Sequence, residues 1–222
     1  MELLNLLKFK NFFIFSIIFS FFIPIYAHSQ ILTPSNKEFF YHYTDREHSI
    51  SEQLIHLSGI YSLSWLVYFG TQKEKFLKRG SWKNFRSHFG KVVFDKDEPI
   101  WNWVGHPYTG SQYYLFYRAK SYSRMQALKM AFLQSALFEF GIEIYTEPAS
   151  VQDLYQTPIL GAVLGYLLEI SSIPLINSDF FVANIVGHIL NPSTLFWFYE
   201  GIIKVSPTIS PNGASLNLYA DF

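Results

Sequence analysis

The chain has no cysteine, and charged residues make up only 15% of its 222 residues. The absence of cysteine excludes disulfide bonds, thiolate catalysis, thiolate metal sites and an acylated N-terminal cysteine anchor. The charges also balance, with 17 basic and 17 acidic side chains. Because a nucleic-acid binder needs a basic face that displaces counterions from phosphates, the composition argues against nucleic acid as a partner.

The motifs of several common enzyme classes are missing as well. The chain has no phosphate-binding glycine loop, no Gly-x-Ser-x-Gly elbow and no HExxH segment. After residue 29 it also lacks a clean run of eighteen apolar residues, because ionisable side chains interrupt each apolar stretch: Lys129, Glu139, Glu143 and Glu169. The sequence therefore predicts neither a familiar catalytic motif nor an independent membrane span after residue 29.

What the chain has in abundance is apolar and aromatic residues, at 50% and 19% of the total. So many aromatic side chains require a large core, a partner or a lipid boundary. Tyr and Trp favour positions with one apolar side and one wet side, as at a membrane interface. This composition predicts a membrane-associated protein.

The N-terminus has the layout of a secretory signal. Lys8 and Lys10 precede the apolar segment 12–26, and the small-residue triplet Ala27-His28-Ser29 follows it. We expect cleavage after Ser29, with an uncleaved signal anchor as the alternative. The expected location is the cell envelope, periplasmic or associated with the outer membrane.

The apolar periodicity of the remaining chain is mainly helical. Ser51 is a plausible N-cap for a helix over 52–69, and residues 71–100 are expected to be a connector with a short amphipathic piece at 82–89. Further helices are expected over 106–120, 123–145, 150–170 and 179–204, the last broken at Asn191-Pro192. The predicted fold is mainly α, a compact, membrane-associated bundle of about five to six helices.

The end of the chain has a different pattern. Residues 215–222 alternate apolar and polar side chains, which is typical of a strand. The alternatives are an edge strand, a disordered tail, or a strand that docks on a barrel. The expected organisation is a signal peptide over 1–29, an irregular lead-in over 30–50, a helical domain over 51–204 and a strand-like tail over 205–222.

The most basic stretch lies between Lys73 and Lys91. It is expected to be a solvated connector, and the alternative is a contact with phosphate or lipid headgroups.

Polar residues that are hard to explain as surface concentrate between 102 and 169. The candidate site residues are His106, Arg118, Glu139, Glu143 and Asp153. Glu139 and Glu143 are four residues apart and share a helical face, so burial would raise the pKa of one of them unless a cation or proton intervenes. Arg118 is the expected partner, because its guanidinium can bind a carboxylate through two hydrogen bonds. His106 is a candidate general base or acid near neutral pH, and Tyr113 and Tyr117 are candidate donors to the cluster.

Three interpretations of this cluster stay open from the sequence. A buried Arg–Glu network can simply fix the mutual position of helices. The same residues can form an acid–base site. A metal site would use His106, Glu139 and Glu143, although no local ligand spacing supports it, and no metal or cofactor is predicted. His188 is expected to be an ordinary buried core histidine.

The same region resembles a known bacterial family. Asn102-x-x-x-His106-Pro107-Tyr108-x-Gly110, followed by Tyr113-Tyr114 and Arg118, is similar to the opening motif of the family catalogued as domain of unknown function 3943. The similarity continues in a later series of residues: Ser135-x-x-x-Glu139, Glu143, Glu147-Pro148-x-Ser150-x-x-Asp153, Thr157-Pro158-x-x-Gly161-x-x-x-Gly165. It covers residues 95–204, about half of the chain.

The resemblance implies an exported envelope protein that is mainly helical in this region and has no established activity. Relatives add a β-rich C-terminal part, of which the last strand-like segment here would be a remnant. The family pattern has Glu directly after the second glycine of the pair, where this chain has Tyr166, with Glu169 one turn later. This departure bears on whether a complete set of carboxylates is retained.

Two classes of function follow from these observations. The first is a non-enzymatic envelope protein with a structural or binding role, for which membrane lipid and other envelope proteins are the partner classes. The second is an envelope hydrolase that acts on a lipid or another amphiphile, with His106, Arg118, Glu139 and Glu143 at its centre. Whether the chain is an enzyme is left open by the sequence.

Overall fold

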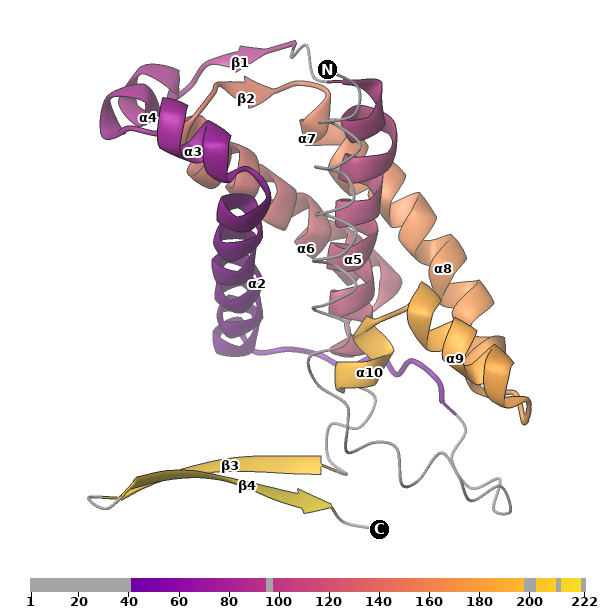
Figure 1. Ribbon diagram of the computed structural model, residues 1–222. Coiled ribbons are helices and arrows are strands. Elements are labelled where there is room, and N and C mark those ends of the chain that lie inside the picture. The colour runs from indigo at the N-terminus through magenta and orange to yellow at the C-terminus, as the bar shows by residue number, and fades with distance from the viewer. Residues whose placement is uncertain (1–40, 95–97, 198–202, 211–212, 221–222) are drawn as a thin grey trace.

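The computed structural model describes residues 41–94, 98–197, 203–210 and 213–220, which are mainly helical (Figure 1). This confirms the mainly α fold expected from the apolar periodicity, whereas association with a membrane stays a prediction. The predicted signal segment 1–29 and most of the lead-in lie outside the described residues.

The first described helix, α2 (Ile50–Thr71), begins two residues earlier than expected. Its N-cap is Ser49 and not Ser51, because Ser49 and Glu52 form a reciprocal capping box. The Glu52 amide donates to Ser49 Oγ, and the Ser49 amide donates to Glu52 Oε2. The helix also continues one residue past Gly70, the expected end.

The expected connector over 71–100 is largely helical. It contains α3 (Lys73–Arg79), α4 (Trp82–His88) and the short strand β1 (Val92–Val93). Ser81 caps α4 by accepting a hydrogen bond from the Asn84 amide at 3.0 Å. Helix α4 coincides with the amphipathic piece expected at 82–89, whereas α3 was not expected, because charges dominate its sequence.

Two central helices agree with the expectation. The π-helical turn η2 (Trp101–Gly105) leads into α5 (His106–Ala119). Ser123 then caps α6 (Arg124–Leu137) through a capping box with Gln126, and the π-helical turn η3 (Phe138–Ile142) and the 3₁₀ turn η4 (Glu143–Tyr145) continue it to Tyr145.

The segment after Ser150 begins as expected and ends later. Strand β2 (Ala149–Ser150) pairs in parallel with β1. The short helix α7 (Asp153–Tyr155), the π-helical turn η5 (Gln156–Leu160) and α8 (Gly161–Ile176) then form one continuous helical rod. It runs past the expected end at Ile170 and contains Pro174.

The remaining elements complete the fold. Helices α9 (Phe181–Leu190) and α10 (Ser193–Trp197) are separated at Asn191-Pro192, as expected. The tail forms an antiparallel hairpin of β3 (Ile203–Ser210) and β4 (Gly213–Ala220). The strand pattern of β4 was expected, but its partner β3 was not, because Pro207 and Pro211 obscured it.

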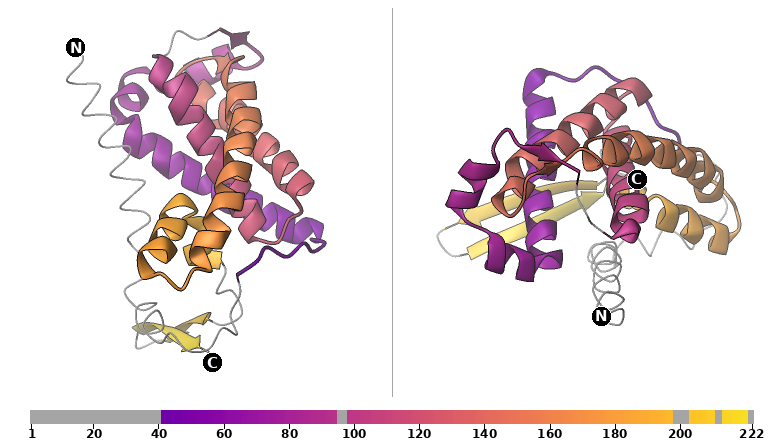
Figure 2. Two further views of the ribbon diagram at one scale, coloured as in Figure 1. Left: turned by 90° about the vertical axis from the view of Figure 1, so that its right-hand side faces the viewer. Right: turned by 90° about the horizontal axis from the view of Figure 1, so that it is seen from above.

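Helices α5 and α8 lie side by side and in parallel (Figure 2). They can approach closely because glycines face each other. A Cβ on Gly110 would lie 1.6 Å from the Thr157 carbonyl oxygen, and one on Gly161 would lie 2.5 Å from the Gly110 Cα. The Gly161-x-x-x-Gly165 pair is therefore a helix-packing motif, as its spacing indicated.

The contacts between α5 and α8 repeat every four residues on both helices. His106 meets Thr157, Gly110 meets Gly161, Tyr114 meets Gly165 and Arg118 meets Glu169. Each pair joins the rows of side chains that recur every four residues on a helix surface. This register places the polar side chains described below.

Among the described residues, the rod Asp153–Ile176 is the one helix long and apolar enough to cross a membrane, with a mean hydropathy of 1.9 over its best window. One third of that window is buried in the protein. Its outer side and α9 expose apolar side chains, among them Val163, Leu167, Phe181 and Ile189. Helices at the core of soluble proteins satisfy the same criterion.

Candidate functional site

Three carboxylates meet inside the helical domain. Glu139, Glu143 and Asp153 are all buried, with relative exposures of 1%, 6% and 2%. One oxygen from each lies within 4.8 Å of the others. Glu139 comes from η3, Glu143 begins η4 and Asp153 begins α7. The structure therefore unites two acids from one helical face with a third from a later segment. We call these three residues the carboxylate cluster.

Ser150 joins the two sides of the cluster. Its backbone amide donates to Glu139 Oε2 at 3.0 Å, and its hydroxyl oxygen accepts from the Asp153 amide at 3.2 Å. The Val151 amide in turn donates to the Val93 carbonyl at 2.9 Å and anchors this turn to β1. Ser150 therefore stabilises the turn that precedes α7 and also fixes the position of Glu139.

His106 lies beside the acids. Its Nε2 is 3.3 Å from Asp153 Oδ1, and its Nδ1 is 3.1 Å from Thr157 Oγ1. The side chain is 18% exposed, so it lies between the buried acids and the surface. The convergence of His106 with the carboxylates, which the sequence left open, is found in the structure.

π-helical turns surround this site. Within the described part of the chain, η2 immediately precedes His106, η3 contains Glu139, and η5 contains Thr157. Pro107 lies just after η2, and Pro158 lies inside η5. Neither proline has the backbone N–H that a regular helical hydrogen bond needs. Such wide turns interrupt helices frequently at functional sites, where they redirect side chains.

The cluster cannot be fully ionised without compensation. Burial raises the pKa of Glu139 well above the usual 4.5, and the nearby charges of Glu143 and Asp153 raise it further. The Ser150 amide opposes this shift. Three carboxylates in contact away from water must therefore share protons or hold a cation.

Further polar atoms near the cluster are buried and have no hydrogen-bond partner among the residues that the structure describes. Ser135 precedes Glu139 by one helical turn, and its Oγ has no partner. Gln156 follows Asp153 by three residues, and its Oε1 has none either. Both side chains are only 2% exposed. Buried polar atoms of this kind indicate that water or an ion belongs near them.

Residues 91–193 match the model of a family described as "Domain of unknown function (DUF3943)". The match confirms the resemblance of this segment to that family, and we refer to the segment below as the DUF3943 domain. It begins at β1 and ends at the start of α10, so it contains every residue of the carboxylate cluster together with His106. No curated protein and no solved structure matches the chain significantly.

The sequence suggested that Arg118 of the DUF3943 domain binds Glu139 or Glu143. The structure shows that it does not. Its Nε donates to Glu169 Oε2 at 3.0 Å, its Nη2 donates to Glu169 Oε1 at 3.2 Å, and its Nη1 donates to Asp45 Oδ1 at 2.7 Å. The reason is geometric. Arg118 follows His106 by twelve residues, which is about 18 Å along a helix.

Arg118 is the centre of a second polar cluster, which we call the arginine cluster. Arg124 donates to Glu169 Oε1 at 3.1 Å, and the Tyr114 hydroxyl donates to Glu169 Oε2 at 2.9 Å. Burial disfavours the Arg118 charge, but the hydrogen bonds that Arg118 donates to Glu169 and Asp45 more than offset this and raise its pKa. Glu169 interrupts an apolar stretch of the sequence, but its pairing with Arg118 was not predicted; the matched four-residue spacing of α5 and α8 is the signal that would have shown it.

The departure of this chain from the family motif is also explained. Tyr166 lies under the Arg124 guanidinium, 4.9 Å from ring centroid to Cζ, and takes part in a cation–π contact. It therefore belongs with the arginine cluster in the middle of α8, while the carboxylate cluster lies before the N-terminus of that helix. The presence of Tyr166 where the family pattern has Glu therefore does not remove a carboxylate from the site around His106.

The two candidate tyrosines do not donate to the carboxylates. Tyr113 Oη is hydrogen-bonded to Ser64 Oγ at 3.1 Å, and burial raises its pKa to about 12. Tyr117 Oη is buried without a partner among the described residues. His188 is a buried core histidine, as expected, with Nδ1 2.7 Å from Thr194 Oγ1 and a pKa lowered to about 4 by burial.

Proposed function

We propose that this chain is an exported cell-envelope protein with a binding role, and that its DUF3943 domain binds a divalent metal ion at Glu139, Glu143 and Asp153. The observation that carries the proposal is the approach of three buried carboxylate oxygens to within 4.8 Å of one another. A divalent cation would neutralise charges that otherwise repel each other in a medium of low dielectric.

The ligand types agree with this role. Carboxylate oxygens are preferred by Mg²⁺, Ca²⁺ and Mn²⁺, and an imidazole beside them also suits Zn²⁺ and Fe²⁺. His106 Nε2, 3.3 Å from Asp153, is placed either to join the ligands or to orient Asp153. The sequence shows no compact metal motif because the ligands come from separate helical segments.

The envelope location rests on the N-terminal pattern. A basic start, an apolar middle and a small-residue exit favour export. Membrane lipid or another envelope protein is a suitable partner for the apolar side chains that α8 and α9 expose. Fractionation of tagged protein, with the mass of the mature N-terminus, tests this part of the proposal. A full-length, cytosolic protein would contradict it.

Metal binding is tested on the purified full chain after treatment with a chelator. Mn²⁺ and Zn²⁺ are titrated separately, and bound metal and the free energy of unfolding are measured. A specific ion at one hundred times its dissociation constant should raise that free energy by about 2.7 kcal/mol.

The decisive variant is Glu139→Gln, which keeps the shape of the side chain and removes its charge. It should abolish both the bound metal and the stabilisation. Glu74→Gln is the matched control, because Glu74 is 71% exposed and pairs with Lys78 on the surface. Equal metal content in wild type and Glu139→Gln would refute the proposal, as would a wild type that binds neither ion.

A second candidate, hydrolysis of a lipid or another amphiphile, is favoured by the contact between His106 and Asp153. A carboxylate that orients an imidazole is the arrangement of a general base. Arg118 cannot bind the substrate there, because it is held by Glu169 and Asp45. Both imidazole nitrogens already have polar neighbours, so the metal site is the better supported function.

The two candidates are separated by His106→Asn, assayed against ester substrates of increasing chain length. A hydrolase would lose its activity while the variant kept its unfolding midpoint. If the wild type binds metal but hydrolyses none of the esters, the hydrolase candidate is excluded and the binding role is retained.

A further inference from the structure

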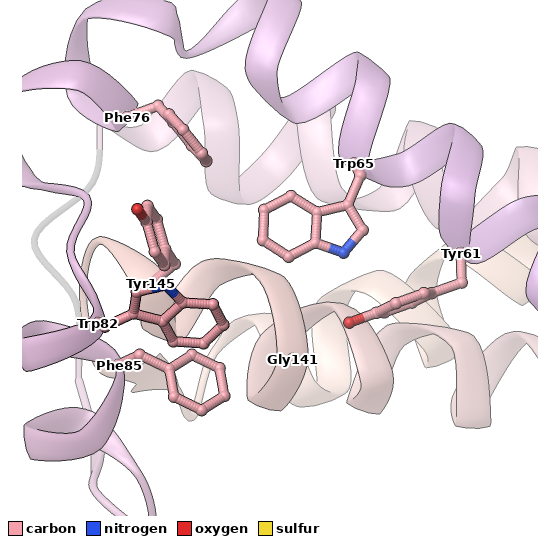
Figure 3. Close-up of a pocket in the computed structure, with 7 residues that line it drawn as sticks. All are labelled: Tyr61, Trp65, Phe76, Trp82, Phe85, Gly141 and Tyr145. Atoms are coloured by element: carbon pink, nitrogen blue, oxygen red, sulfur yellow. The ribbon is translucent and has the colours of Figure 1, made fainter.

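An open cavity of about 530 Å³ lies between α2, α3, α4 and the turns η3 and η4 (Figure 3). It is lined by Tyr61, Trp65, Phe76, Trp82, Phe85, Gly141 and Tyr145. Figure 3 shows the rings arranged around one common space, although they come from four separate parts of the chain. Its volume and aromatic lining are typical of sites for small molecules.

This aromatic cavity is separate from the carboxylate cluster. Gly141 and Tyr145 line it, whereas Glu139 and Glu143 reach the cluster. Each pair is four residues apart, and the two pairs are offset by two residues along the same segment. They therefore lie on opposite faces of it, and the cavity is independent of the proposed metal site.

The walls of the cavity are held together by polar contacts. The Ser81 amide donates to the Tyr145 carbonyl at 3.2 Å, and His88 Nδ1 lies 2.9 Å from the Ile144 carbonyl. Lys75 forms an ion pair with Glu147. These contacts attach α3 and α4 to the turn η4, so the rings are positioned before any ligand arrives.

Two donors point into this space from α2. Figure 3 shows the Tyr61 hydroxyl and the Trp65 indole nitrogen directed toward it. Neither group has a hydrogen-bond partner within the described part of the chain. The indole N–H can only donate, so it cannot bind the cationic head of a ligand. Gly141 permits this arrangement, because a Cβ there would lie 2.5 Å from Tyr61 Oη.

The helices that supply the rings also carry an excess of positive charge. Arg79 follows Phe76 by three residues and Arg86 follows Trp82 by four, so each shares a helical face with a lining ring. Among the described residues, Arg86 has no ionic partner. The acid nearest to Arg79 is Glu147, at 3.9 Å, and it is shared with Lys75. This charge attracts anions and disfavours the cationic ligands that aromatic cages otherwise bind.

We propose that the aromatic cavity binds an anionic amphiphile, a molecule with an apolar body and one anionic head. The body would pack against Trp65, Phe76 and Phe85, and its head would lie at the cationic rim near Arg79 and Arg86. Burial of the apolar body supplies most of the affinity, and the arginines select the sign of the head group.

Calorimetric titration of the full chain with decanoate, below the concentration at which it forms micelles, tests this proposal. Decyltrimethylammonium and decanol have the same chain length and serve as the cationic and neutral probes. We expect saturable binding of decanoate, weaker binding of decanol and no binding of the cation. Equal affinity for decanoate and the cation would overturn the proposal.

Two variants locate the site. Arg79→Gln combined with Arg86→Gln changes only exposed side chains and should weaken decanoate binding about tenfold or more, while decanol binding is unchanged. Trp65→Ala should abolish binding, and Trp103→Ala is its control, because Trp103 is 65% exposed and lies outside the cavity. Unfolding midpoints are measured for each variant. A double arginine variant that binds decanoate like the wild type would refute the charged rim.

A last comparison distinguishes a free amphiphile from a bilayer. Vesicles of phosphatidylglycerol and of phosphatidylcholine are sedimented with the wild-type chain. Binding to phosphatidylglycerol vesicles without any binding of monomeric decanoate would show that this region is a membrane-surface patch, and would overturn the cavity proposal. Binding of decanoate that competes with the vesicles would support it.

Discussion

Two polar clusters lie in the helical domain, and they differ in charge balance. The arginine cluster places Arg118 and Arg124 against Glu169 and Asp45, so two cations meet two acids. The carboxylate cluster places three acids together, with the imidazole of His106 as the basic group beside them. Among the described residues, the arginine cluster pairs cations with acids, while the carboxylate cluster gathers acids whose charges repel one another.

The difference indicates different roles. The buried Arg118–Glu169 pair fixes the position of two helices, because each of these charges loses its hydration and needs its partner. A group of like charges is costly to keep buried and gives no such rigidity, so a binding role explains it better. The arginine cluster is therefore the packing network that the sequence had assigned to Glu139 and Glu143.

The largest effect is expected when the balance of the arginine cluster is broken. Arg118→Leu leaves Glu169, whose side chain is 4% exposed, with a much weaker set of partners. We expect the free energy of unfolding, measured with denaturant, to fall by about 3–5 kcal/mol. Arg46→Leu is the control, because Arg46 pairs with Glu52 on the surface and should cost about 1 kcal/mol or less. Similar losses in both variants would show that the buried cluster has no special role.

A smaller loss is expected when the register of α5 and α8 is disturbed. Gly110→Ala would place a methyl group 1.6 Å from the Thr157 carbonyl oxygen. The helices must separate, which we expect to cost about 1–3 kcal/mol and to weaken metal binding as His106 and Thr157 part. Gly59→Ala is the control, since Gly59 has nothing within 4 Å of its added Cβ and lies inside α2. That change should stabilise the protein by about 0.5–1 kcal/mol, and a loss there would contradict the packing argument.

The smallest effect, with a different sign, is expected at Glu139. Because its pKa is raised in the folded protein, the folded state holds a proton that the unfolded chain releases near pH 4.5. Without metal, the stability of the wild type should therefore fall as the pH rises from 4.5 through the raised pKa. Glu139→Gln should flatten this dependence and be at least as stable as the wild type at neutral pH.

Unfolding curves of chelator-treated protein at several pH values check this expectation. A variant that is less stable than the wild type across the whole range would show that the ionised carboxylate stabilises the fold, as it would in a matched ion pair. The carboxylate and arginine clusters would then not differ in the way proposed.

Much of the local structure could be predicted from the sequence. The helices that begin at His106 and after Ser123, the capping turn at Ser150 and the glycine pair of α8 follow from neighbouring residues. Helix α3 and strand β3 were missed, because their charged or proline-containing sequences resemble loops. Helix α4 corresponds to the amphipathic piece expected at 82–89.

The candidate site was predicted only in part, for a related reason. The sequence identified which acids are carried by apolar helices, and it showed that Glu139 and Glu143 share a face. It did not show that Asp153 and His106 join them, because these contacts connect segments far apart in the chain.

By itself, the sequence determined the residue types, the helical periodicity and the imbalance between acids and available partners within the apolar region. Only the tertiary structure decided that Arg118 meets Glu169 while the three acids meet one another. The physical reason is that side-chain periodicity is a property of each helix alone. Which faces meet depends on how closely two backbones can approach, and here the glycines of α5 and α8 set that register.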